Sequence, residues 1–213
     1  MLRFALAGIP VTIDWWFWLI IFILGPNLTV ATPEDWMQVA IWMTVVFVSI
    51  MIHELGHAMV GRRFGAQPSI HLHGFGGSTY LPGARFRRTQ SILVSAAGPL
   101  AGFVTGLAVL LLDSIVGNQP RWMRIAVRDA LWVNFAWTLV NLLPIQPLDG
   151  GQILREVLGP RRAQITAWIG LVLAGVLCLW TFSAGLYFSS FMLAVLAYLN
   201  FRQEPMEGGV IKQ

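Results

Sequence analysis

Six long apolar stretches restrict this chain to the class of membrane proteins. A helix that spans a bilayer needs roughly 20 predominantly apolar residues. The sequence offers six stretches that reach or approach this length, at about 13–25, 37–61, 90–112, 129–146, 163–182 and 184–201. Only 11% of the 213 residues are charged, whereas a soluble domain carries about 25%. We therefore predict an all-α membrane protein with six transmembrane helices, folded as a single polytopic domain over residues 1–213.

The distribution of basic residues predicts how the chain is oriented in the cell membrane. If the N-terminus is cytoplasmic, 11 of the 14 Lys and Arg residues fall in cytoplasmic segments, and only Arg121, Arg124 and Arg128 fall in outer loops. This is the positive-inside pattern. Both termini are therefore expected in the cytoplasm. The net charge of +4 follows from this topology, so we expect no nucleic-acid partner.

One group of ionisable residues interrupts the second apolar stretch, where His53-Glu54-Leu55-Gly56-His57 forms an H-E-x-x-H motif. Ionisable residues within a span are costly and usually functional. On a helix, His53 and His57 lie one turn apart on the same face, so both imidazoles can reach one zinc ion. Glu54 lies about 100° round the helix from His53, where it can serve as a general base without being a ligand. Two core histidines without function are the alternative, which leaves the buried Glu54 unexplained.

The third zinc ligand is expected in the broken segment from Asn141 to Gly151. A catalytic zinc usually has three protein ligands and one open position. Pro144 and Pro147 must interrupt the helix in this segment, and broken backbone at membrane depth is tolerated where it lines a cavity. Asp149 follows this break and arrives at the cytoplasmic side, the level predicted for the two histidines. We therefore predict one Zn²⁺ per chain, held by His53, His57 and Asp149.

These motifs resemble those of the site-2 protease family of intramembrane zinc metalloproteases. The resemblance covers most of the six-span core and includes residues 95–101 and Gly8-Ile-Pro-Val. It implies that Glu54 is catalytic and that Asn141 orients the substrate or the oxyanion. Many members have His where Asp14 stands. The chain looks like the compact type without PDZ or CBS domains, and a transmembrane or membrane-tethered protein is the implied substrate.

Residues 70–80 begin with alternating apolar and polar side chains and are rich in glycine. This pattern predicts a short β-hairpin or re-entrant segment after the second span. In the family, a comparable segment lies near the site, and an extended substrate could pair with its edge. His71 and His73 could form a second metal site, although two ligands alone rarely suffice. Gly98, Gly102 and Gly106 recur at four-residue spacing, which indicates close helix packing rather than chemistry.

The predicted reaction is hydrolysis of peptide bonds within or near transmembrane segments. Two alternatives are a membrane metal transporter and a metal-binding scaffold without protease activity. Histidine and aspartate within spans would suit ion passage. Glu54 favours the protease, because neither alternative needs a base that is not a ligand beside the first histidine.

Overall fold

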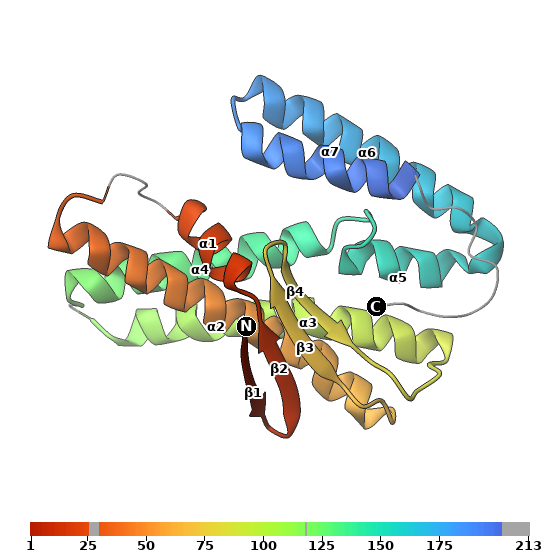
Figure 1. Cartoon of the computed structure of the whole chain (residues 1–213), viewed down its shortest axis with the longest axis horizontal. Coiled ribbons are helices and arrows are strands. Elements are labelled where there is room, and N and C mark those ends of the chain that lie inside the picture. The colour runs from red at the N-terminus through yellow and green to blue at the C-terminus, as the bar shows by residue number, and fades with distance from the viewer. Residues whose placement is uncertain (26–29, 118, 202–213) are drawn as a thin grey trace. The chain divides into compact units, whose positions relative to one another are not determined.

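The computed structural model describes residues 1–25, 30–117 and 119–201, which are mostly helical with one small sheet (Figure 1). These residues form two compact units. The first comprises Met1–Arg85 and Ala97–Thr138, and the second comprises Phe86–Ala96 and residues 139–201. The elements in chain order are β1 (Leu2–Leu6), β2 (Ile9–Ile13), α1 (Trp15–Ile23), α2 (Pro33–Arg63), β3 (Ser69–His73), β4 (Gly76–Tyr80), α3 (Arg88–Ile115), α4 (Arg121–Asn141), α5 (Asp149–Leu158), the 3-10 turn η1 (Pro160–Arg162), α6 (Ala163–Ser183) and α7 (Tyr187–Phe201).

The first unit contains a four-stranded sheet in the order β1-β2-β3-β4 (Figure 1). β3 and β4 form the predicted antiparallel hairpin, with Ile70 opposite Thr79. β1 and β2 form a second hairpin that the predicted all-α class leaves out, and β2 pairs in parallel with β3. The apolar residues Ile9, Val11 and Ile13 recur at every second position of β2. All three are buried, while Pro10 between them is exposed. This period of two is that of a half-buried strand.

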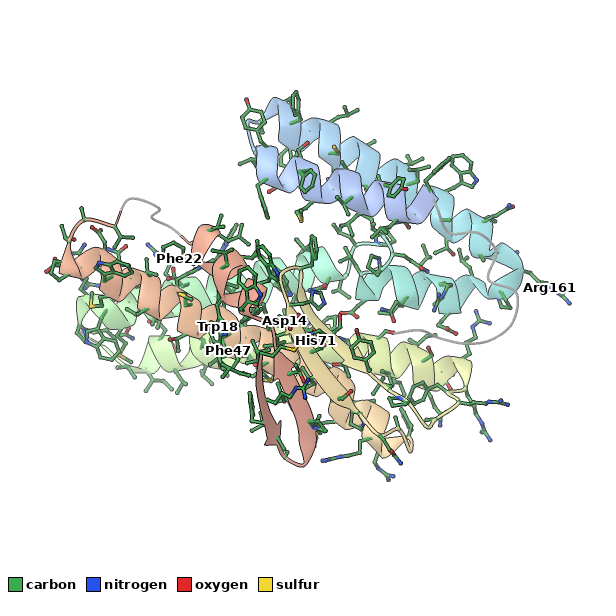
Figure 2. All side chains as sticks on the ribbon, viewed as in Figure 1. Asp14, Trp18, Phe22, Phe47, His71 and Arg161 are labelled. Carbon is green, nitrogen blue, oxygen red and sulfur yellow. The ribbon has the colours of Figure 1, made fainter. Side chains whose placement is uncertain are left out.

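One face of the sheet packs into the core of the first unit. Ile70 and Leu72 of β3 are fully buried and belong to the same apolar cluster as Phe17 of α1 and Ile50 of α2. The Trp18 and Phe47 rings, labelled in Figure 2, pack with centroids 5.4 Å apart and join α1 to α2. The sheet is thereby fixed against the helix that carries the H-E-x-x-H motif.

Each of the six predicted stretches overlaps one helix, but the helices differ in length. Among the described residues, three helices are long and apolar enough to cross a membrane: Pro33–Arg63, Arg88–Ile115 and Pro160–Ser183. The helix in the first stretch has nine residues, and α7 has 15. A nine-residue helix extends only about 14 Å, less than half of the bilayer core. The six-span count therefore stays a prediction, as does the single domain, while the apolar helices indicate a membrane protein.

The second unit contains the helices that follow the predicted break. α6 and α7 are joined by residues 184–186 and pack side by side in opposite directions (Figure 1). Asn200 of α7 is 1% exposed although it lies in an apolar helix. The position of its side chain is considered with the broken segment below.

Candidate metal centre and catalytic base

The two histidines of the motif occupy one buried turn of α2. His53 and His57 are 5% and 8% exposed, and their Nε2 atoms lie 3.1 Å apart. Two imidazole nitrogens bound to one tetrahedral zinc at ~2.05 Å would be about 3.3 Å apart. The pair is therefore arranged as two ligands of one ion would be, which agrees with the prediction from helical spacing.

Glu54 is buried beside this pair and is contacted by the edge strand of the sheet. Its side chain is 5% exposed. The Thr79 hydroxyl of β4 donates a 2.7 Å hydrogen bond to Glu54 Oε2 and lies 3.1 Å from the Glu54 carbonyl oxygen. Gly77, two residues earlier on the same strand face, lies so close that a Cβ there would be 2.4 Å from Glu54 Oε1. The carboxylate is thus enclosed by protein and hydrogen-bonded.

A glycine of α3 makes room for the second histidine. A Cβ added at Gly98 would lie 2.1 Å from His57 Nε2. A Cβ added at Gly56 would lie 2.5 Å from the Ala97 carbonyl oxygen. The sequence predicted that Gly98 serves helix packing alone. The structure shows that Gly98 also bounds the space of a predicted ligand, which four-residue spacing could not reveal.

In the second unit, the chain breaks where the prolines predicted it. α4 ends at Asn141, and α5 begins at Asp149, after Pro144 and Pro147. Asn141 is half-buried and Asp149 is 8% exposed. A carboxylate in the first turn of a helix is favoured by the helix dipole.

Asn200 of α7 holds the broken segment of the second unit. Its Nδ2 donates to the Gln146 carbonyl oxygen at 2.6 Å, and its Oδ1 accepts from the Gln146 backbone N–H at 3.2 Å. Both backbone groups of one residue in the break are therefore satisfied by a single amide. Gly170 of α6 leaves space for this amide, because a Cβ there would lie 2.3 Å from Asn200 Oδ1. Sequence reasoning missed Asn200, and its only signal was an amide in an apolar stretch.

The three predicted ligands are two histidines of the first unit and one aspartate of the second. His53, His57 and Asp149 are all buried. Imidazole nitrogens and a carboxylate oxygen are ligands that zinc accepts. The chemistry of the donor set therefore fits the predicted ion.

Comparisons with known proteins agree with this chemistry. The family model described as "Peptidase family M50" matches residues 123–182. The chain is 27% identical over 186 residues to zinc metalloprotease MJ0392 of Methanocaldococcus jannaschii, covering 83% of this chain and 52% of that protein. It is 30% identical over 155 residues to the putative zinc metalloprotease YwhC of Bacillus subtilis, covering 57% of this chain and 71% of the relative.

The chain belongs to peptidase family M50, the site-2 protease family of zinc metalloproteases. Its fold is similar to the solved structure of the site-2 protease from M. jannaschii, with a TM-score of 0.65 and 23% identity over 98% of this chain and 97% of the other. The chain spans about half the length of MJ0392. The family resemblance drawn from the motifs is thus confirmed, and zinc is the metal named for these M50 relatives.

In this M50 chain, His71 and His73 have partners within the sheet and its surroundings. Asp14, which stands where many family members have His, accepts from His71 Nε2 at 3.0 Å, and the two side chains lie next to each other in Figure 2. His73 Nε2 bonds Ser78 Oγ at 2.9 Å. Within the described residues, neither histidine belongs to a group of three metal-ligating side chains. The structure therefore provides no support for the second metal site.

The hydrogen bonds of the His73 ring indicate which of its nitrogens carries a proton. Its Nδ1 accepts from the Phe75 backbone N–H at 3.2 Å, so Nε2 carries the proton and donates to Ser78. Burial lowers the pKa of His73, and the neighbouring His71 lowers it further. The neutral imidazole is therefore the form that the folded sheet accommodates.

Proposed function

We propose that this chain is an intramembrane zinc metalloprotease that hydrolyses peptide bonds within or near transmembrane segments of membrane protein substrates. The observation that carries the proposal is the turn of α2 in which two buried imidazoles lie 3.1 Å apart beside a buried, hydrogen-bonded Glu54. Membership of family M50 supports it. Neither a transporter nor a scaffold needs a positioned carboxylate at that place.

In this proposal, His53, His57 and Asp149 hold one zinc ion. When bound, zinc lowers the pKa of a water molecule toward ~7 and polarises the scissile carbonyl. Glu54 accepts the proton of the attacking water and then returns it to the leaving amine. Asn141, at the end of α4, is proposed to orient the substrate or the developing oxyanion through its amide.

The substrate must present an extended peptide bond, because the amides of a helix are already hydrogen-bonded to one another. β4 lies at one edge of the sheet in the order β1-β2-β3-β4. An unwound substrate segment could therefore add to this edge through main-chain hydrogen bonds. We further propose six spans in the cell membrane, with both termini and the site toward the cytoplasm, as the distribution of basic residues predicts.

The deciding experiment replaces the proposed base and leaves the proposed ligands intact. Purified Glu54→Gln should retain the zinc content of the unaltered protein and lose cleavage of a membrane-inserted substrate by about 100-fold or more. Glu34→Gln is the matched control, because Glu34 is an exposed glutamate of the same helix. Zinc per chain and the rate of product formation are measured for all three proteins. Unchanged cleavage by Glu54→Gln would exclude Glu54 as the base.

A further inference from the structure

The side chain of Glu54 is held by a strand and not only by its own helix. The Thr79 hydroxyl reaches across from β4 to Glu54 Oε2 at 2.7 Å. This hydroxyl is buried, since Thr79 is 9% exposed, and it also lies within 3.1 Å of the Glu54 carbonyl oxygen. A hydrogen bond from a hydroxyl to a carboxylate is charge-assisted and stronger than a bond between neutral groups. The bond therefore restrains the carboxylate.

The strand residue on the same face completes this contact. Gly77 and Thr79 are two positions apart in β4, so they face α2 together. A Cβ at Gly77 would lie within 2.6 Å of three side-chain atoms of Glu54. The glycine lets the strand approach until the threonine hydroxyl reaches Oε2. The two residues therefore hold the carboxylate together: Thr79 binds Oε2, and Gly77 leaves space beside Oε1.

Restraint matters here because of what a general base must do. A base must lie within about 2.6–3.2 Å of the proton that it abstracts, yet a glutamate side chain has several rotatable bonds. Fixing Oε2 on Thr79 leaves Oε1, on the Gly77 side, to accept the proton of the attacking water. The strand thus supplies the orientation that α2 alone does not.

We propose that Thr79 is a positioning residue for the Glu54 general base, with Gly77 providing the space for it. This inference rests on the proposed protease function. It assigns a catalytic consequence to the predicted hairpin beyond any role in holding substrate. Loss of the hydroxyl should lower kcat and leave KM and zinc content close to those of the unaltered protein, because Thr79 acts on the base rather than on substrate or metal.

The test compares Thr79→Val, which keeps the branched shape without the hydroxyl, with Thr79→Ser, which keeps the hydroxyl. The full chain is purified with zinc, and kcat and KM are measured on a membrane-inserted substrate. We expect kcat of Thr79→Val to fall roughly tenfold to 100-fold, as loss of one bond to a charged group predicts. We expect Thr79→Ser to stay within about threefold of the original kcat. Thr181→Val is the matched control, since among the described residues that buried hydroxyl is hydrogen-bonded to helix carbonyls of α6.

The outcomes separate the inference from the function on which it rests. Absence of cleavage by the unaltered protein would reject the protease, whereas cleavage by it and equally by Thr79→Val would reject the positioning role. A rise in KM without a fall in kcat would also reject it. If Thr79→Val loses its fold or its zinc, kcat of Thr79→Ser is compared with kcat of Thr79→Ala. Both side chains are smaller than threonine, and they differ from each other only by the hydroxyl oxygen. Equal kcat of these two variants would overturn the proposal.

Discussion

Adding one methyl group at Gly98 should remove zinc from the protein while leaving α3 helical. The added Cβ would lie 2.1 Å from His57 Nε2, 2.5 Å from Cε1 and 2.7 Å from Cδ2, whereas ordinary contacts begin at 3.4 Å. The ring must therefore retreat by about 1.3 Å, and ligand distances tolerate only about 0.2 Å. Since loss of an outer-shell partner alone costs 10- to 100-fold in metal affinity, we expect Gly98→Ala to weaken zinc binding by about 100-fold or more.

Gly106→Ala, two turns further along α3, is the matched control. Its Cβ would meet the Phe135 ring at 2.9 Å, and the outer end of a ring can turn aside. Both changes raise helix propensity by about 0.5–1 kcal/mol, so a difference between them cannot come from the helix itself. Zinc affinity is measured by competition with a chelator and zinc content by mass spectrometry. Wild-type affinity in Gly98→Ala, or an equal loss in both variants, would refute the proposed contact with the His57 ring.

Three further changes test other parts of the structure. Gly56→Ala would place a Cβ 2.5 Å from the Ala97 carbonyl oxygen, so it should lower the free energy of unfolding by about 1–3 kcal/mol, measured by denaturation in detergent. Asn200→Ala removes both bonds to the Gln146 backbone and should cost about 1–3 kcal/mol in the same assay. His73 has a lowered pKa in the folded state, so its contribution to stability is present above about pH 6.5 and is lost as the pH falls and the unfolded chain takes up a proton. The melting temperature of His73→Gln should therefore fall less between pH 7.5 and 5.5 than that of the unaltered protein, and an equal fall would contradict this assignment.

Local patterns predicted the parts of the site that lie within one element. The 100° step of a helix places His53 and His57 together, and proline chemistry ends α4 before Asp149. Glycine-rich alternation predicted the β3–β4 hairpin. Each of these inferences needs only residues that are neighbours in the chain.

Contacts between elements could not be predicted in the same way. The pairing of Val11 with Ile70 joins strands separated by two helices. The approach of Gly98 to His57 depends on how α3 packs against α2. Glycine spacing indicates that a helix can pack closely, but it does not name the side chain on the other side. The sequence therefore predicted the candidate ligands and the candidate base, while the residues that contact them could be found only from the fold.

Two glycines of neighbouring elements contact the H-E-x-x-H turn. Because they have no side chains, they leave space for ionisable groups in an otherwise apolar helix. Gly98 faces His57, and Gly77 faces Glu54 from the sheet. A buried charge is costly unless it is paired or hydrogen-bonded, so the carboxylate needs the Thr79 hydroxyl as well as space. A larger residue at either glycine would collide with the His57 ring or the Glu54 carboxylate and displace that side chain. The small residues of α3 and β4 thus let a helix and a strand approach the motif closely enough to enclose His57 and Glu54.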